Sequence, residues 1–272
     1  MAETWKSPGR SGRVLYAVAA LFFGGLVTVF ARLRVAKQRG RRRAARALPD
    51  GPIIIVSNHA GYADGVLLAL VCRRMGRSVR LLATAGVFRA PLIGSLARRL
   101  GFIPVARGTK DAAGALAPAA EALAAGEAVA IFPEGRTTRD PNHWPERAKT
   151  GAVRLALQSG APIVPVAMVG THRVLGRGAS VGSIMVNVVL RPAVLTDVGE
   201  PIDVQAMAGD APLDNEGVRE LTDRVWARIV ALVEALREEA APDPSGVMPD
   251  TDEGDTDQDL GDYDSVLNGS DS

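Results

Sequence analysis

Cysteine and histidine are scarce in this chain of 272 residues, and each shortage excludes a class of protein. The one cysteine, Cys72, excludes an intrachain disulfide framework and every zinc module that is built on cysteine ligands. The three histidines, His59, His143 and His172, leave little material for a histidine-rich metal site.

Several nucleotide-binding and hydrolase motifs are also absent from the sequence. It has no Gly-x-Gly-x-x-Gly opening a helix, no Gly-x-x-x-x-Gly-Lys-Ser/Thr loop and no Gly-x-Ser-x-Gly turn. These absences argue against dinucleotide-binding enzymes, P-loop NTPases and α/β-hydrolases. Disorder of the whole chain is excluded as well, because 47% of the residues are apolar and 23% are charged.

Charge of one sign is nearly missing from each end of the chain. Residues 1–46 contain eleven Lys or Arg and one acid, whereas residues 240–272 contain ten acids and no base. The overall net charge of +2 therefore conceals three regions with different properties. We predict a membrane-anchoring helix with a basic flank over residues 1–46, a folded domain over 47–240 and an acidic, disordered tail over 241–272.

The longest apolar run covers residues 14–31 and predicts a helix of roughly 27 Å, close to the hydrocarbon thickness of about 30 Å. Because the run is apolar on all sides, it has no solvated face to lay on a soluble core. We expect it to span or lie in a membrane, in preference to a signal peptide or a buried core helix. Eight basic residues follow it and three precede it, so the positive-inside bias places the body of the protein in the cytoplasm.

The middle of the chain alternates between strand-like and helix-like segments. Apolar, β-branched runs cover residues 52–56, 128–132, 162–169 and 183–190, with shorter runs near 79–83 and 102–106. Helical patterns lie near residues 65–75, 89–99, 111–125, 149–159 and 215–239. Runs that are apolar throughout, separated by helices, indicate a sheet that is buried on both faces. We predict an α/β fold: a mainly buried central sheet flanked by helices, with an N-terminal membrane-associated helix.

Polar residues directly follow the first of these strands. Residues 57–65 read Ser-Asn-His-Ala-Gly-Tyr-Ala-Asp-Gly and precede a helix, a position where α/β folds place ligands. In a straight helix His59 and Asp64 would point about 140° apart, so they meet only if His59 lies in the turn and Asp64 in the first helical turn. A carboxylate on one ring nitrogen would leave the other nitrogen as a base. The alternative is an exposed loop histidine and an acid that only begins a helix.

Arginines follow two more of the predicted strands. Arg107 ends the segment over residues 101–108, and Arg136 and Arg139 follow the Phe-Pro-Glu-Gly sequence at residues 132–135. Guanidinium groups form planar, multidentate contacts that suit phosphate, so these arginines are candidates for an anion clamp. Each of them alone is more often a solvated surface arginine.

Together these segments resemble the glycerolipid acyltransferase family, of which 1-acylglycerol-3-phosphate acyltransferase is typical. Asn58-His59 with Asp64 is similar to the family's His-x-x-x-x-Asp motif. Residues 101–107 resemble its second block, residues 132–136 its Phe-Pro-Glu-Gly block and residues 163–166 its fourth. Four blocks in the family's order over roughly 50–170 form a specific match, which does not reach the acidic tail.

The resemblance implies roles for individual residues. His59 would be the general base and Asp64 its orienting partner, and the base would remove a proton from an acceptor hydroxyl that attacks the thioester of acyl-CoA or acyl-carrier protein. No metal, no bound cofactor and no enzyme-bound acyl intermediate is implied. The substrate-binding positions would be Asn58, Arg107, Glu134, Gly135, Arg136 and Lys149, with the arginines holding a phosphate.

One departure from the family's pattern concerns the acceptor. The family commonly reads Phe-Pro-Glu-Gly-Thr-Arg-Ser, with arginine two residues past glycine, whereas Arg136 follows Gly135 directly. A shift of one position changes where the side chain points, so Arg139 is an alternative ligand for the same phosphate. The departure affects the identity of the acceptor more than the reaction.

The hypothesis from sequence is an O-acyltransferase at the cell membrane, with its catalytic domain on the cytoplasmic side. It would acylate lysophosphatidic acid to phosphatidic acid in phospholipid biosynthesis, with membrane lipids as partners and without nucleic acid. The alternatives are another acceptor, such as a different lysophospholipid, glycerol 3-phosphate or a glycolipid, and a catalytically inactive lipid-binding scaffold. Nucleic-acid binding through residues 32–46 is a third.

Overall fold

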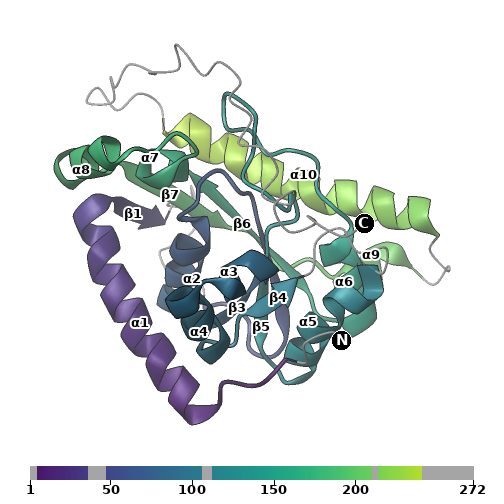
Figure 1. The fold of residues 1–272 in the computed structure, drawn as a ribbon. Coiled ribbons are helices and arrows are strands. Elements are labelled where there is room, and N and C mark those ends of the chain that lie inside the picture. Colours follow the sequence, from purple (N-terminus) through teal and green to yellow (C-terminus); the bar gives the residue numbers. More distant parts are fainter. Residues whose placement is uncertain (1–4, 36–46, 106–111, 210–213, 241–272) are drawn as a thin grey trace, which may run out of the picture. The chain divides into compact units, whose positions relative to one another are not determined.

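The structure is a computed structural model that describes residues 5–35, 47–105, 112–209 and 214–240. The described residues up to Glu239 belong to one compact unit. Its strands are β1 (Arg32–Val35), β2 (Ile53–Ser57), β3 (Val79–Thr84), β4 (Ile103–Val105), β5 (Ala128–Ile131), β6 (Ile163–Val169) and β7 (Ala193–Val198). They form one sheet in the order β1-β7-β6-β2-β5-β3-β4 (Figure 1).

The sheet is mixed, with one change of direction. Strands β6, β2, β5, β3 and β4 run parallel, whereas β7 is antiparallel to β6 and β1 is parallel to β7. Every residue of β2 is buried, as its continuous apolar sequence requires of a central strand in a parallel sheet. The predicted α/β fold with a buried central sheet is confirmed.

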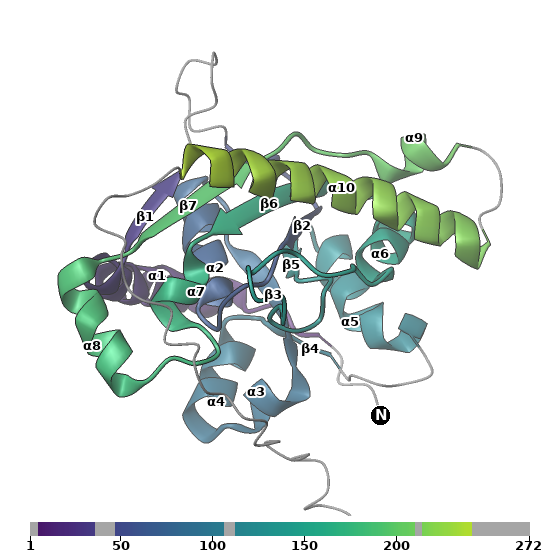
Figure 2. The same cartoon turned by 90° about the horizontal axis from the view of Figure 1, so that it is seen from above.

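Helices cover both faces of the sheet. They are α1 (Gly9–Phe30), α2 (Asp64–Arg74), α3 (Ala85–Arg89), α4 (Pro91–Arg99), α5 (Ala112–Ala124), α6 (Gly151–Ser159), α7 (Thr171–Leu175), α8 (Val181–Leu190), α9 (Val204–Ala208) and α10 (Asn215–Glu239). Figures 1 and 2 show α1 and α10 on opposite sides of the sheet. We call the side of α1, α2, α4 and α8 the α1 side, and that of α5, α6 and α10 the α10 side.

Each face of the sheet has its own hydrophobic core, because successive residues of a strand point to opposite faces. Ile53 and Ile55 pack with Leu67 of α2 on the α1 side. Ile54, between them in the strand, packs with Ile229 of α10 on the other side. The two cores are separate clusters, so burial of the sheet requires helices on both faces.

The predicted strand over residues 183–190 is wrong. This segment is the helix α8, and the strand β7 follows it after Pro192. A short apolar run cannot be assigned to strand or helix from its pattern alone, and a helix needs no neighbouring strand to satisfy its backbone at the surface. Strand β1 was also not predicted; it brings residues 32–35 of the basic flank into the sheet.

Helix α1 matches the predicted apolar helix and begins a few residues earlier. Among the described helices it is the one long and apolar enough to cross a membrane by length and composition. Residues 36–46 of the basic flank and the acidic tail at 241–272 lie outside the described residues. The division of the chain into three regions, at residues 46 and 240, stays a prediction.

Candidate active site

The candidate site lies at the carboxyl ends of three neighbouring parallel strands, β6, β2 and β5. His59 follows β2, Glu134 follows β5 and Thr171 follows β6. Three loops that are distant in the sequence therefore meet at one edge of the sheet. This is the edge where open α/β sheets bind ligands.

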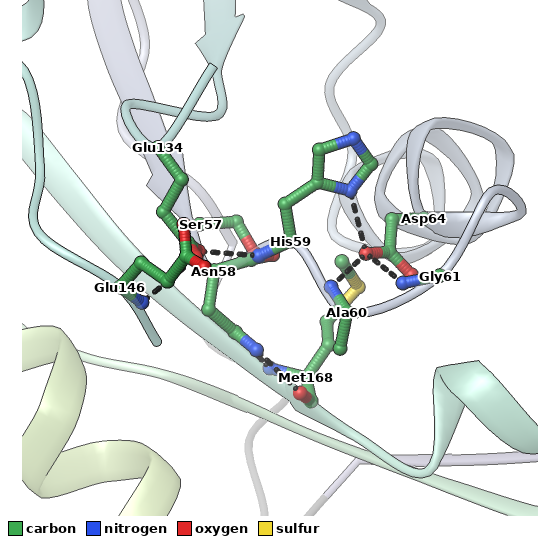
Figure 3. Close-up of polar contacts among 9 residues, drawn as sticks. All are labelled: Ser57, Asn58, His59, Ala60, Gly61, Asp64, Glu134, Glu146 and Met168. Atoms are coloured by element: carbon green, nitrogen blue, oxygen red, sulfur yellow. Dashed lines mark hydrogen bonds and ion pairs between the residues drawn. The ribbon is translucent and has the colours of Figure 1, made fainter. Parts of the chain in front are cut away.

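His59 and Asp64 are hydrogen-bonded to each other in this site (Figure 3). Asp64 is the first residue of α2 and is fully buried, and its Oδ2 lies 2.9 Å from His59 Nδ1. The same oxygen accepts hydrogen bonds from the backbone N–H groups of Ala60, at 2.7 Å, and Gly61, at 2.9 Å. Three donors hold the carboxylate, so it fixes the orientation of the ring and leaves Nε2 as the free nitrogen.

The turn that carries His59 depends on Gly61. A Cβ atom at this position would lie 2.9 Å from the backbone oxygen of Thr171 and 3.1 Å from that of Leu175. Tyr62 donates its backbone N–H to Leu175 O at 2.8 Å. Because no side chain fits there, glycine lets α7 close over the turn and hold it.

The ring of His59 is held on its face as well as at its edge. The ring stacks on Phe132 at a centroid distance of 4.4 Å. The backbone oxygen of His59 also accepts from Thr138 N at 2.7 Å. The side chain is still 19% exposed. The ring is therefore accessible from outside the protein, while packing keeps it in one position.

Glu134 supports the backbone of this turn. One carboxylate oxygen accepts from His59 N at 2.8 Å and the other from Glu146 N at 2.9 Å. Burial, partly opposed by these two hydrogen bonds, raises the pKa of Glu134 to about 7. Glu134 was predicted to bind substrate, and in the structure its two oxygens are occupied by backbone groups of the site itself.

Glu146 pairs with Arg136, and its importance was missed in the sequence. Its Oε2 accepts from Arg136 Nε at 3.1 Å and Nη2 at 2.8 Å, and its Oε1 accepts from Arg139 N at 2.9 Å. The hydrogen bond from Arg139, followed by that from Arg136, lowers the pKa of Glu146. The charge of Arg136 is thus already compensated within the chain. Its spacing from Glu146 matches no motif, so only the folded loop reveals the pair.

The other predicted substrate-binding residues lie in different surroundings. Asn58 is buried, and its amide donates to Met168 O at 2.9 Å and accepts from Met168 N at 2.8 Å (Figure 3). Lys149 is exposed, and its ammonium group lies 3.0 Å from where a Cβ of Gly135 would be. Arg107 lies outside the described residues. The site thus brings His59, Asp64 and Glu134 together and gives Asn58 a partner in β6.

The two remaining histidines stack on each other and not on His59. The rings of His143 and His172 lie 3.9 Å apart. Burial, with smaller effects from the nearby His143, Arg173 and Arg237, lowers the pKa of His172 to about 3. His172 is therefore neutral over the physiological range. Among the described residues no group of three His, Cys, Asp or Glu is arranged to hold a metal ion.

An apolar pocket opens beside the catalytic turn, between α1, α2 and α4. Its volume is about 160 Å³, and Tyr16 contributes the one polar side chain of its lining. Gly65 and Val66, which follow Asp64 directly, form part of its wall. A cavity with this lining suits an apolar ligand.

The sequence profile of the family described as Acyltransferase matches residues 34–169, half of the chain. The chain belongs to the acyltransferase family. The match extends from within β1 to the end of β6, so it includes the loops after β2 and β5 of the acyltransferase-family site and ends just before Thr171 and α7.

Curated relatives match this acyltransferase-family chain over a shared core. It is 30% identical over 131 residues to the chloroplastic 1-acyl-sn-glycerol-3-phosphate acyltransferase BAT2 of Brassica napus, covering 48% of this chain and 36% of that protein. It is 33% identical over 129 residues to the lyso-ornithine lipid O-acyltransferase of Pseudomonas aeruginosa, covering 46% of each. The chain thus spans between about a third and a half of these relatives' lengths.

A solved structure shares the fold. The crystal structure of the 1-acyl-sn-glycerophosphate (LPA) acyltransferase, PlsC, from Thermotoga maritima superposes with a TM-score of 0.60. The similarity covers 87% of this chain and 84% of that one, at 19% sequence identity. At this identity the likeness establishes the α/β architecture of the acyltransferase-family chain.

Proposed function

We propose that the chain transfers a fatty acyl group from acyl-CoA or acyl-carrier protein to the free hydroxyl of lysophosphatidic acid, giving phosphatidic acid. The observation that carries the proposal is the pair of His59 and buried Asp64, 2.9 Å apart, beside an apolar pocket. Membership of the acyltransferase family and the relatives named 1-acyl-sn-glycerol-3-phosphate acyltransferase support the same reaction.

In the proposed reaction His59 Nε2 takes the proton of the acceptor hydroxyl as its oxygen attacks the thioester carbonyl carbon. The new carbon–oxygen bond forms a tetrahedral oxyanion, which collapses as the carbon–sulfur bond breaks. The leaving thiolate then takes the proton from the imidazolium of His59. A thioester is already activated, so one well-positioned base suffices and no acyl-enzyme is required.

Asp64 acts on the ring nitrogen that faces away from substrate. Its carboxylate accepts from Nδ1–H, which selects the tautomer in which Nε2 carries the lone pair. It also stabilises the imidazolium that forms when the proton is transferred. Because Ala60 and Gly61 donate to the same oxygen, the carboxylate does not need to reorganise during the reaction.

We assign the acceptor's phosphate to Lys149 together with Arg107. Lys149 lies over Gly135, which follows Glu134, the residue that accepts from the backbone of His59, and it is an exposed cation. Arg136 is less suited, because Glu146 already neutralises its guanidinium group. The acyl chain of the donor would occupy the pocket between α1, α2 and α4, and no metal or bound cofactor takes part.

The proposed place of action is the cytoplasmic face of the cell membrane. Acceptor and product both partition into the bilayer, so a site that works on them has to operate at its surface. The apolar helix α1 and the basic residues after it support this location.

A second acceptor class is favoured by the pairing of Arg136 with Glu146. A site whose Phe-Pro-Glu-Gly loop carries a neutralised arginine has less positive charge for a phosphomonoester. Such a site suits a lysolipid with a zwitterionic head group. The match to the relative named lyso-ornithine lipid O-acyltransferase supports this alternative within the same reaction.

The test is acyl transfer by the purified full chain from radiolabelled palmitoyl-CoA and from palmitoyl-carrier protein. The acceptors are lysophosphatidic acid, lysophosphatidylcholine and lyso-ornithine lipid in detergent. We expect His59→Ala to lower turnover by about 100-fold or more, since a positioned base contributes 100- to 10,000-fold. His143→Ala, a histidine of the neighbouring loop, is the matched control and should retain activity.

The outcomes separate the alternatives. If the wild type acylates lysophosphatidic acid and His59→Ala does not, the proposal is supported. Activity of the wild type on another lysolipid would support the same reaction with a different acceptor. Wild-type turnover by a folded His59→Ala variant would show that His59 is not the base. If the wild type acylated no acceptor from either donor, the lipid-binding scaffold would be the better description.

A further inference from the structure

Acidic residues are absent from three long segments of this chain. Residues 5–49, 65–110 and 171–196 contain eleven, nine and three Lys or Arg, 23 of the 32 in the chain, and none of its 30 Asp or Glu. Among the described helices, α1, α3, α4, α7 and α8 belong to these segments, and so does α2 after its first residue, Asp64. Because Asp64 is fully buried, the charge that these helices present on the surface is of one sign.

The same segments carry the exposed apolar side chains. Of the 16 large hydrophobic residues that are exposed in the described part of the chain, 15 belong to them, all but Tyr62. The exposed fractions are highest at Leu21 of α1, 78%, Leu92 of α4, 86%, and Val189 of α8, 82%. Soluble surfaces rarely collect apolar side chains in this way unless something covers them.

Helix α8 is inverted relative to an ordinary surface helix. Its polar residue Asn187 is buried and donates to the backbone oxygens of Arg173 and Val174 in α7. Met185 and Val189 point outward. A helix with its amide against protein and its valines exposed is suited to an apolar medium outside.

The two apolar helices form one continuous surface. Helices α1 and α8 contact each other, and Figures 1 and 2 show them on the same side of the sheet. Arg32, just after α1, donates to the backbone oxygen of Arg191, just after α8, at 2.8 Å. Basic residues thus border the apolar surface where both helices end.

Both ends of α1 are tied to the same α/β unit. Before the helix, Trp5 Nε1 donates to Gly101 O at 3.0 Å; within it, Tyr16 accepts from Val79 N at 3.2 Å. After it, the chain enters the sheet as β1, with Arg32 opposite Ala193. A helix of 22 residues is about 33 Å long, so crossing a bilayer would place these attachments on opposite sides of it.

We infer that α8 is a second lipid-contacting element, and that α1 lies along the surface of an anionic bilayer beside it without crossing. The exposed faces of α1, α8 and the start of α4 would enter the acyl boundary, and the surrounding arginines would meet lipid phosphates. This inference extends the membrane association in the proposed function, but it does not depend on acyl transfer.

The first test is flotation of the full chain with vesicles of phosphatidylcholine and phosphatidylglycerol. The variant Met185→Glu/Val189→Glu changes two exposed positions one turn apart on α8. The control Ala227→Glu/Ala231→Glu adds the same charges at the same spacing on the exposed face of α10. We expect the α8 variant to bind at least about tenfold more weakly than the control, because two apolar side chains no longer enter the lipid.

The second test measures depth along α1. Single spin labels at Val14, Leu21 and Val29, three exposed positions on the helix, report accessibility to oxygen and to a water-soluble nickel complex. A helix that lies in the interface gives one common depth at all three. A crossing helix would give depths that differ by up to about 22 Å, from 1.5 Å per residue.

Three results would overturn the inference. Equal vesicle binding by the α8 variant and its control would remove α8 from the lipid surface. A graded depth along α1 would make it a crossing helix. A wild-type dimer without lipid, converted by the α8 variant to a monomer that still binds vesicles, would assign the surface to a second copy of the chain. Loss of acyl transfer with intact vesicle binding would count against the proposed function alone.

Discussion

The two sides of the sheet are covered by helices with opposite surfaces. Helix α10 turns Val225 and Ile229 toward the sheet and exposes charged residues such as Glu234. Helix α1 exposes Leu21 and Phe22, and α8 exposes Val189. An apolar pattern therefore does not show by itself whether the apolar face of a helix packs on the sheet or lies on the surface. In this chain the sign of the nearby charge distinguishes the two sides.

The candidate site lies where the two sides meet. Asp64 is the one acid of residues 51–110, so it is the exception on the otherwise acid-free α1 side. It is also fully buried, and three donors hold its carboxylate. All three donors contact Oδ2, whereas the buried Oδ1 has no hydrogen-bond partner among the described residues. A buried acid that commits one oxygen to His59 and its turn is expected to serve the chemistry, and four predictions test how far the two sides differ.

The largest effect is expected for Asp64→Asn. The amide cannot stabilise an imidazolium at His59, so we expect turnover to fall by about 1,000-fold, within the range for loss of general-base function. The matched control is Asp223→Asn on α10, whose exposed pair with Arg219 contributes little. Steady-state kinetics with both variants measures the difference, and comparable turnover of the two would contradict the special position of Asp64.

Truncation of either core should destabilise the domain to a similar degree. Leu67 on the α1 side and Ile229 on the α10 side are both fully buried. We expect Leu67→Ala and Ile229→Ala each to lower the free energy of unfolding by about 3 kcal/mol, the middle of the range for such cavities. Urea denaturation in detergent measures both. A loss confined to Ile229→Ala would show that the α1 side is not a packed core.

Glu134 should make stability fall as pH rises. Burial raises its folded-state pKa to about 7, above the ordinary value of 4.5, so the folded protein binds this proton more tightly than the unfolded chain. Stability from this group is then full at low pH and is lost between about pH 4.5 and 7. Relative to Glu134→Gln, we expect the wild type to lose about 2 kcal/mol of unfolding free energy between pH 5 and 8. Chemical denaturation at several pH values gives the slope, and parallel curves would contradict the raised pKa.

The smallest effect is expected from single arginines. Arg177, exposed between α7 and α8, should contribute about 1 kcal/mol to binding of anionic vesicles, or about fivefold. Arg228, exposed on α10, should contribute nothing. Vesicle flotation of Arg177→Gln and Arg228→Gln with and without phosphatidylglycerol tests the pair. A loss of equal size for both would mean that the two sides do not differ in their contact with lipid.

Most of the fold could be predicted from sequence, because five strands are buried runs bounded by helical patterns. The failures share a physical cause. Helix α8 carries an apolar, β-branched run that fits a strand equally well, and its exposure is decided only by what surrounds it. Strand β1 has four residues with two arginines, and its pairing with β7 depends on a partner more than 150 residues away.

The candidate site divides in the same way. Spacing alone left the meeting of His59 and Asp64 open, since it requires a turn at His59 and a helix that starts at Asp64; the resemblance to the family predicted the pair, and the structure contains it. The hydrogen bonds that Glu134 accepts from the backbone of His59 and that Glu146 accepts from Arg136 could not be predicted. Those contacts depend on how residues 136–149 fold back over the site, and this loop has no periodic pattern to read.

Asn58 substitutes for a peptide unit. Its side-chain amide donates to and accepts from the main chain of Met168, as a neighbouring strand would, one residue after β2 has ended. The main chain is thereby released from the sheet while its hydrogen bonding to β6 continues. The next residue, His59, can then turn away from the sheet while Asn58 remains fixed to β6. A change of backbone register in β6 would consequently displace His59, although no side chain of β6 contacts its ring among the hydrogen bonds and stacking contacts of the described residues.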